Sequence, residues 1–411
     1  MSVARGAGAA VVMALLTAAC GSAAGGAGTG HDGAAHADDE VSCRVAELVD
    51  TPDGVPVDQP TPSPPEPVVR AVDDPTDPRL PTPLVDPAEL VPLGTRDGIA
   101  PIDDPRFVPA TDIRFLAPCE AVLVVELNGD VRAYPVQILV WHEIVNDTVG
   151  GVPLAVTYCP LCNSAVAVER TVDGRILDFS TSGWVRNSAL VMYDRQTGTL
   201  WDHFVGEAII GDLTGTRLVR HAVQTVSFAQ LLAVHPGARV LTRDTGARRS
   251  YGLNPYRFYD ETATAFGFSG IAPGPYAEKE HFVGVALGDD AVAVRLEGLL
   301  AGGVVHLDVA GVPVVVWATP GVASPLSGQL TNAGREVGAT GVFEARVGAR
   351  RLHFERRRDR FVDRESGSTW TVTGTAVAGP LAGSRLTPVE HLDTFWFAWT
   401  AFHPGTRVVD P

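Results

Sequence analysis

Hydrophobic and polar positions alternate over most of the chain after residue 96, in short runs broken by glycine- and asparagine-containing turns. Apolar residues at 123–127 and 131–134 flank Asn128-Gly129, a pair typical of two-residue hairpin turns. A second hairpin is predicted from 165–170 and 176–179, and further strands from 152–158, 190–193 and 199–204. Short helices are predicted at 135–142, 228–234 and 395–401. The pattern predicts an α+β fold made mainly of antiparallel strands.

An internal repeat divides the folded part into two related halves. Segments of the first half return in the same order in the second, 128–133 as 288–293, 151–156 as 311–316, 194–201 as 363–370, and 206–218 as 374–386. Such self-similarity indicates one module used twice. We therefore expect two tandem pseudo-repeats of a β-rich module with short helices, a first copy over 96–270 and a degenerate second copy over 271–411.

Four reactive side chains of the first copy have no counterpart at the matching positions of the second copy. In the second copy Cys159 and Cys162 are replaced by Thr319 and Val322, His142-Glu143 by Gly302-Gly303, and His203 by Val372. Residues that both copies keep are explained by the fold, whereas residues found in one copy are candidates for chemistry. The comparison therefore selects the two cysteines and the two histidines.

The first twenty residues have the features of a bacterial lipoprotein signal peptide. Arg5 precedes an apolar stretch at 9–18, which is too short to span about 30 Å of hydrocarbon as a permanent helix. Small residues then lead into Cys20, an arrangement that resembles a lipobox. We expect Cys20 to be lipidated and to anchor the exported chain on the outer side of the cytoplasmic membrane. An ordinary cleaved signal peptide is the alternative.

Composition predicts the state of the chain before residue 96 and limits the kinds of partner. Residues 21–95 are rich in glycine and alanine and then in proline, which predicts a disordered, partly extended tether. A net charge of −16 argues against a nucleic-acid partner. The arginines between 346 and 364 interleave with apolar residues as on a solvated hairpin. The membrane, through Cys20, is the one partner that the sequence indicates.

Five cysteines are present in the chain. With Cys20 lipidated, the simplest arrangement in an oxidising compartment is a disulfide between Cys43 and Cys119, which would pin the tether to the domain. Cys159 and Cys162 then remain as a local pair. Spacing alone leaves the connectivity open.

The Cys159-Pro160-Leu161-Cys162 segment lies between two predicted strands, and thiol–disulfide exchange is the first function that it indicates. A thiolate is the active species in such chemistry, and Cys-x-x-Cys pairs often have a lowered pKa. In thioredoxin-like proteins the first cysteine opens a helix, whereas here a strand pattern follows Cys162. His142 is the candidate base beside the two thiols.

Metal binding and a structural role are the other two interpretations. Cys-Pro-x-Cys resembles the knuckle of zinc ribbons and rubredoxins, but one knuckle supplies only two of the four ligands of a closed site. His142 and His203 are the candidate further ligands of one zinc, copper or iron ion, with Glu143 as a supporting partner. Alternatively, the cysteines form a structural disulfide in a non-enzymatic binding or assembly module. Glu143, Tyr193 and Tyr256 are candidate pocket residues.

Several blocks of the sequence resemble the bacterial domain-of-unknown-function family 3179. These blocks are 98–108 (GIAPIDDPRFV), 132–135 (RAYP), 141–147 (WHEIVND), 156–165 (VTYCPLCNSA), and 192–195 with 200–201. The resemblance extends from about residue 96 to the C-terminus, draws attention to His142, Cys159 and Cys162, and implies no assigned activity. The chain departs from the family's pattern at Ser180, at Cys119 and at His203, where a glutamine is commoner.

Overall fold

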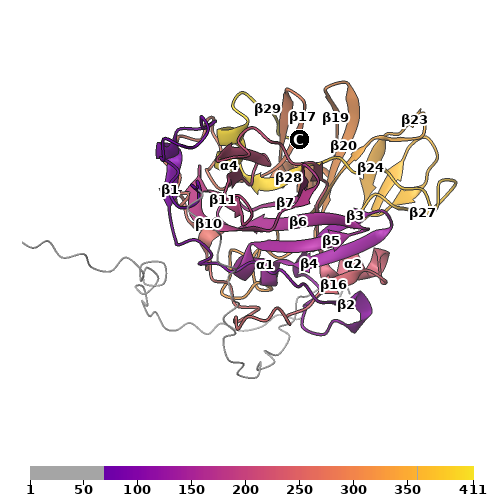
Figure 1. Ribbon diagram of the computed structural model, residues 1–411. Helices are drawn as coiled ribbons and strands as arrows, with labels where there is room; N and C mark the ends of the chain where they lie inside the picture. Colours follow the sequence, from indigo (N-terminus) through magenta and orange to yellow (C-terminus); the bar gives the residue numbers. More distant parts are fainter. Residues whose placement is uncertain (1–68, 359) are drawn as a thin grey trace, which may run out of the picture. The chain divides into compact units, whose positions relative to one another are not determined.

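The structure, a computed structural model, describes residues 69–358 and 360–411. These residues form an α+β fold dominated by antiparallel sheets, as predicted (Figure 1). The predicted signal peptide, the lipidation of Cys20 and the pairing of Cys43 with Cys119 involve residues outside the described ones. Cys119 itself is disulfide-bonded. No helix of the described residues is long and apolar enough to cross a membrane.

The predicted Asn-Gly hairpin lies in a five-stranded sheet. In order across the sheet, its strands are β15 (Gln224–Ser227), β3 (Ala121–Leu127), β4 (Asp130–Pro135), β16 (Arg239–Leu241) and β2 (Phe107–Pro109). Asn128 and Gly129 have φ of 51° and 81°, the left-handed conformation that a tight hairpin turn of this kind requires. Helix α1 (Val136–His142) follows β4 directly. It ends at His142, whose side chain is buried.

The CPLC segment connects two strands of a four-stranded sheet. Its strands, in order, are β14 (Arg220–His221), β7 (Ser164–Glu169), β6 (Val152–Cys159) and β5 (Ile144–Val149). The predicted hairpin of 165–170 with 176–179 is wrong, because β7 already pairs with β6 across the CPLC turn. Asp173-Gly174 instead turns a small ribbon of β8 (Thr171–Val172) and β9 (Arg175–Ile176).

Residues 69–95 are part of the folded unit, which corrects the predicted tether boundary at residue 95. Strand β1 pairs with β10 in a sheet of β1 (Leu90–Pro92), β10 (Phe179–Arg186), β11 (Ala189–Asp194), β12 (Leu200–Asp202) and β13 (Glu207–Ile210). Ala71, Val72 and Leu90 are buried in an apolar cluster on this sheet. The many prolines of this segment led to the prediction of a disordered tether. The segment nevertheless packs on the sheet, because these apolar side chains are buried there.

Five consecutive elements of the second half have the same lengths and order as β3, β4, α1, β5 and β6. They are β17 (His281–Leu287), β18 (Asp290–Arg295), α3 (Leu296–Gly302), β19 (Val304–Val309) and β20 (Val312–Thr319). The tandem repeat itself remains our interpretation of this correspondence. Helix α2 (Phe228–Val234) has the predicted bounds, whereas α4 (Trp396–Phe402) begins one residue later than predicted because Phe395 still belongs to a strand.

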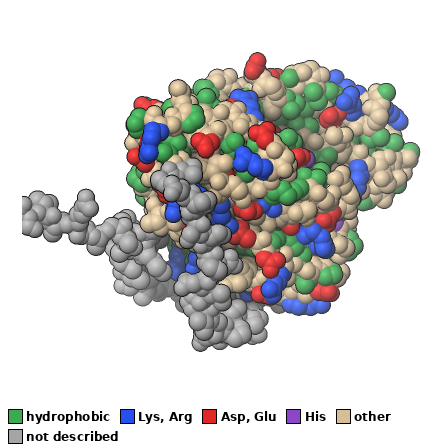
Figure 2. All heavy atoms as spheres, in the orientation of Figure 1, with side chains coloured by type: hydrophobic (Ala, Val, Ile, Leu, Met, Phe, Trp, Pro, Cys, Tyr) green, Lys and Arg blue, Asp and Glu red, His purple; other side chains and the backbone are tan. Residues whose placement is uncertain are grey.

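The remaining strands complete the sheets of the second half. They are β21 (Ala339–Glu344), β22 (Arg346–Val347), β23 (Arg350–Arg351), β24 (Phe354–Arg357), β25 (Arg360–Asp363), β26 (Thr369–Trp370), β27 (Ala376–Ala378), β28 (Leu392–Phe395) and β29 (Arg407–Val409). The predicted copies are not separate, because the backbone N–H of Phe395 and the hydroxyl of Thr394 donate to the carbonyl oxygen of Cys162 at 3.2 and 2.8 Å. Charged side chains of both signs are interspersed on the visible face (Figure 2).

Candidate functional site

The CPLC segment forms a tight turn at the end of a buried hairpin. Strand β6 ends at Cys159 and β7 begins at Ser164, and these two residues are cross-strand partners. Asn163 closes the turn with φ of 49°, a left-handed conformation that asparagine tolerates. Cys159 and Cys162 are both free thiols, with 2% and 0% of their surface exposed. The turn therefore holds two reduced cysteines inside the protein.

A chain of hydrogen bonds leads from Cys162 to a buried histidine. The sulfur of Cys162 lies 3.0 Å from the hydroxyl oxygen of Ser164, and that oxygen lies 3.0 Å from Nε2 of His203. The other ring nitrogen of His203, Nδ1, lies 2.8 Å from the hydroxyl of Thr157. We call Cys162, Ser164, His203 and Thr157 the thiol relay.

The direction of the thiol relay follows from its last member. The Thr157 hydroxyl donates to the carbonyl oxygen of Val166 at 3.2 Å, so its oxygen accepts from Nδ1–H of His203. Nε2 of His203 is then the acceptor for the Ser164 hydroxyl, whose oxygen accepts from the thiol of Cys162. The relay can therefore carry a proton from Cys162 toward His203.

Burial keeps both titratable groups of the thiol relay, Cys162 and His203, uncharged at neutral pH. Burial raises the pKa of the Cys162 thiol well above its usual value, and the neighbouring Cys159 raises it further, against the opposing effect of Ser164. Burial lowers the pKa of His203 to about 3, and the nearby Arg220 contributes to the same shift. The closed site thus holds a thiol and a neutral imidazole rather than a thiolate and an imidazolium.

His142, the predicted base, is hydrogen-bonded elsewhere. Its Nδ1 lies 2.7 Å from the carbonyl oxygen of Ala100, and its Nε2 lies 2.5 Å from the hydroxyl of Tyr251. Burial lowers its pKa to about 4, so the ring is neutral and both of its nitrogens are engaged. The structure therefore connects the thiols to His203 and not to His142.

The predicted metal ligands are not assembled into one cluster. Across residues 69–358 and 360–411, no group of three or more His, Cys, Asp or Glu side chains is arranged to hold a metal ion. In the predicted set of Cys159, Cys162, His142 and His203, a serine separates the second cysteine from the nearest imidazole. The geometry gives the metal hypothesis no direct support.

The three predicted pocket residues occupy two different places. Tyr256 donates to the Glu143 carboxylate at 3.0 Å, and the charges of Glu143 and then Cys159 add to the burial that raises the pKa of Tyr256. These two residues therefore lie beside the thiol turn. Tyr193 instead donates to the Asp97 carboxylate at 2.8 Å in the β11 sheet, where it supports the fold.

A segment between the two halves, residues 259–266, contacts the thiol turn and its neighbour Ser188, and we call it the covering segment. The hydroxyl of Tyr259, in the short 3₁₀ helix Tyr259–Glu261, donates to the carbonyl oxygen of Leu161 at 3.0 Å. Ser188 donates to the carbonyl oxygen of Phe266 at 2.6 Å, and its own carbonyl oxygen lies 3.8 Å from the sulfur of Cys159. Phe266 is 53% exposed, so the covering segment lies at the surface of the protein where it contacts Ser188.

Sequence reasoning missed Ser164, Thr157, Ser188 and Tyr259. The first two carried a signal, because Thr157 lies two residues before Cys159 in the same strand, and residues two apart share one face. Ser164 likewise follows Cys162 by two residues. Ser188 and Tyr259 reach the turn only through tertiary folding and had no local signal.

Comparison with known proteins assigns a family without an activity. Residues 96–406 match the family described as "Protein of unknown function (DUF3179)". No curated protein and no solved structure matches the chain.

Proposed function

The chain belongs to this family of unknown function, so its activity must be inferred from its own site, and we propose that Cys159 and Cys162 form a thiol–disulfide redox centre. The proposal places this centre in the cell envelope, on a chain anchored through Cys20. It rests on the residues of the turn and on their hydrogen-bond partners.

The observation that carries the proposal is the thiol relay. A purely structural pair of thiols needs no path for a proton, whereas disulfide formation requires that Cys162 lose one. Ser164 and His203 supply that path at 3.0 Å for each step. Their hydroxyl and imidazole are the groups that general acid–base chemistry uses.

The proposed reaction transfers two electrons to a disulfide substrate. The Cys159 thiolate attacks the substrate disulfide, which gives a mixed disulfide and releases the first substrate thiol with the Cys159 proton. Cys162 then passes its proton through Ser164 to His203, and its sulfur attacks Cys159. The Cys159–Cys162 bond forms, and the second substrate thiol leaves with the proton from His203. The cysteines are oxidised and the substrate is reduced to two thiols.

The order of attack follows from the position of the two sulfurs. The sulfur of Cys159 lies 3.8 Å from the carbonyl oxygen of Ser188, whose hydroxyl contacts the covering segment, whereas the sulfur of Cys162 lies 3.0 Å from Ser164 of the thiol relay. Because the thiolate is the nucleophile in such an exchange, the attack requires that Cys159 lose its proton. Movement of the covering segment would admit both the substrate and the water that stabilises a thiolate.

The test is a redox titration of the full chain against reduced and oxidised glutathione, with the reaction rate measured in parallel. We expect a reversible Cys159–Cys162 disulfide. Ser164→Ala and His203→Gln should slow its formation by about 100-fold or more while leaving the redox potential unchanged, because the relay moves a proton and not the bonding electrons. His221→Gln is the matched control. This partly exposed histidine lies in the same sheet, but it forms a hydrogen bond with Glu169 and is not part of the thiol relay. Its rate should equal that of the unchanged chain.

Other outcomes would favour the alternatives. Stoichiometric bound metal that is lost in Cys159→Ser would support metal binding. A Cys159–Cys162 bond that glutathione does not reduce would support a structural disulfide in a binding or assembly module. If no disulfide forms between the two cysteines, the redox proposal fails.

The location rests on residues 1–20 alone. Fractionation of cells that express the full chain should recover it with membranes, and Cys20→Ala should release it or block its processing. Unchanged recovery of the variant with membranes would contradict lipid anchoring through this residue.

A further inference from the structure

Two hairpins of the second half carry an excess of positive charge. Residues 346–364, which include β22–β23 and β24–β25, contain eight arginines and three acidic residues, a net charge of +5, whereas the rest of the chain carries −21. Strands β23 and β24 lie on the right of Figure 1, and Lys or Arg side chains are visible there in Figure 2. Six of the arginines are exposed, and we call them the arginine patch: Arg346, Arg350, Arg351, Arg357, Arg358 and Arg364.

Both hairpins place arginine opposite arginine. Arg346 is the cross-strand partner of Arg351, and Arg357 is the partner of Arg360. Like charges directly opposite one another in a sheet are destabilising. Negative charge beside these pairs would remove that cost.

The acidic residues of the hairpins compensate only part of the positive charge. Glu344 pairs with Arg346 at 2.6 Å, and Glu355 is shared by two arginines of the patch. Within the described residues, Arg351 and Arg358 form no ion pair. Both are exposed, so their guanidinium groups are available to an external anion.

The matching strands of the first half lack these arginine pairs. In the ribbon β8–β9, Thr171 lies opposite Ile176 where β22–β23 has two opposing arginines. At the turn of β10–β11, Arg186 lies opposite Ala189, where β24–β25 again has two. Similar strands therefore form without the opposing charges, which makes these charges candidates for a function.

The patch does not converge on one point. Arg351 ends β23 and Arg358 follows β24, and the four residues of β24 between them in the chain span about 13 Å. A guanidinium group binds phosphate through two parallel N–H bonds. A single small anion would contact one or two such groups, whereas a surface of many phosphate groups can contact all of them. The spread therefore favours a phospholipid surface.

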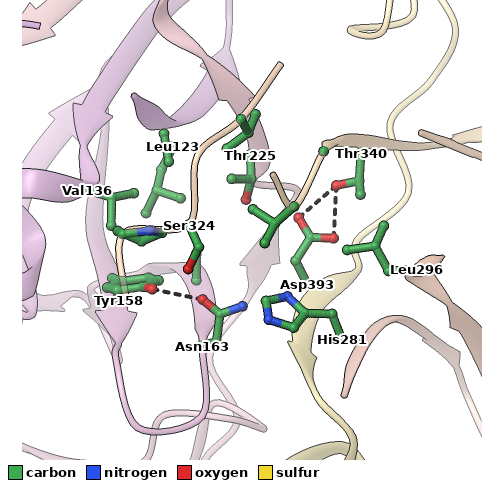
Figure 3. Close-up of a pocket in the computed structure, with 16 residues that line it drawn as sticks. Leu123, Val136, Tyr158, Asn163, Thr225, His281, Leu296, Ser324, Thr340 and Asp393 are labelled. Carbon is green, nitrogen blue, oxygen red and sulfur yellow. Dashed lines mark hydrogen bonds between the residues drawn. The ribbon is translucent and has the colours of Figure 1, made fainter. Parts of the chain in front are cut away.

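The second half is held against the half that carries the thiol turn. Both halves line one small cavity, to which the first contributes Tyr158 and Asn163 and the second contributes His281, Thr340 and Asp393 (Figure 3). Tyr158 donates to Asn163 at 2.8 Å, and Thr340 donates to Asp393 at 2.7 Å. Docking of the arginine patch on a surface would therefore also set the orientation of the thiol turn.

We propose that the arginine patch docks on the anionic phospholipid headgroups of the membrane that anchors the chain. The inference rests on the proposed anchor at Cys20 and not on the redox chemistry. The 48 residues from 21 to 68 reach at most about 170 Å, so the anchor alone leaves the orientation of the folded part open. The patch sets this orientation, because arginines near an anionic surface are attracted while the negative remainder of the chain is repelled.

Sedimentation with lipid vesicles tests the proposal on the full chain with Cys20→Ala, which carries no lipid. We expect binding to vesicles of phosphatidylcholine with phosphatidylglycerol. Arg351→Gln with Arg358→Gln should weaken this binding by about tenfold or more. Arg175→Gln with Arg248→Gln is the matched control, because it removes the same charge from two exposed arginines of the first half. The control should weaken binding by less than about twofold.

Two measurements need no arginine variant and so do not depend on its folding. Binding should fall steeply as the salt concentration rises, because salt screens exposed charges. Vesicles of phosphatidylcholine alone should bind far less, and they measure any contact made by the apolar stretch at 9–18. Cys159→Ser should bind as its parent chain does, which separates this test from that of the redox centre.

Four outcomes would overturn the proposal. They are absence of binding to the anionic vesicles, equal binding to neutral vesicles, and equal loss in the two double variants, which would indicate a general effect of net charge. The fourth is displacement by inorganic phosphate beyond the effect of chloride at the same ionic strength, which would assign the patch to a soluble phosphate compound. Because the chain in this test is not lipidated, failure here is distinct from failure of the anchor at Cys20.

Discussion

At the scale of single residues, Glu143 shows how the site departs from an ordinary core. It ends α1 with φ of 58°, a conformation that costs free energy for a residue with a side chain. Its buried carboxyl group accepts from Tyr256, yet burial still raises its pKa from 4.5 to about 7. The folded protein therefore binds a proton here that the unfolded chain releases between pH 4.5 and 7, so stability falls as the pH rises through this range.

Replacing Glu143 by glutamine should remove this pH dependence. The amide keeps an oxygen for Tyr256 but does not ionise, so Glu143→Gln should be more stable than the unchanged chain at pH 8 by about 3 kcal/mol. At pH 4.5 the two should be nearly equal. Urea unfolding at both pH values measures the difference, with the exposed Glu261→Gln as control. A difference that is the same at both pH values would show that Glu143 is not titrating.

At the scale of elements, Trp317 of β20 in the second half packs among the aromatic rings of Phe343, Phe354 and Phe361. Trp317 and Val372 occupy the positions that we match to Thr157 and His203, and the indole N–H of Trp317 donates to the carbonyl oxygen of Val372 at 2.8 Å. Trp317 also stacks on Phe361 with the ring centroids 4.3 Å apart. The same strand geometry thus supports a tryptophan-filled core in one half and a polar relay in the other.

Gly341 of β21 is a position where this packing leaves no room for a side chain. A Cβ atom there would lie 2.5 Å from both the indole nitrogen of Trp317 and the carbonyl oxygen of Val372. Gly341→Ala should therefore destabilise the protein by about 2 kcal/mol or more. Gly302→Ala, at the end of α3, is the control, because a Cβ atom built there meets no other atom within 4 Å. This substitution should change the free energy of unfolding by less than about 1 kcal/mol. Equal unfolding midpoints would contradict the tight packing.

At the scale of the whole molecule, residues 69–95 belong to the fold although the family match begins only at residue 96. Val72 and Leu90 cover Leu200 and Ile210 of the β12–β13 part of the sheet. The backbone N–H of Leu93 also donates to the carbonyl oxygen of Gly183 at 2.9 Å. Without this segment, a sheet face with large apolar side chains would contact water.

A chain shortened to begin at residue 96 should accordingly be less stable than one that begins at residue 69. The lost burial of Val72 and Leu90 corresponds to about 3–6 kcal/mol. Chemical denaturation of the two shortened chains measures the difference in their free energies of unfolding. Because both chains lack the residues before 69, they differ only in residues 69–95. Identical midpoints would mean that the segment contributes nothing to stability.

The sequence by itself determined the local features of this protein. The Asn128-Gly129 hairpin, the bounds of α2 and the tight turn at Cys159–Cys162 were predicted because each depends on neighbouring residues. Family membership was also visible, since the HEIVND and TYCPLCNSA blocks are contiguous. The cysteines could be chosen as candidates because the segment of the second half that we match to theirs lacks them.

Only the tertiary structure decided which groups surround the thiols. His142 and His203 were both candidates, and His203 departed from the family's pattern, yet His203 is the one joined to Cys162. Sheet pairing brings strands together that are distant in sequence, and a hydrogen bond then depends on a few tenths of an ångström that no local pattern specifies. The covering segment around Tyr259 and the cavity at Asp393 arise in the same way, from contacts between halves that sequence spacing does not encode.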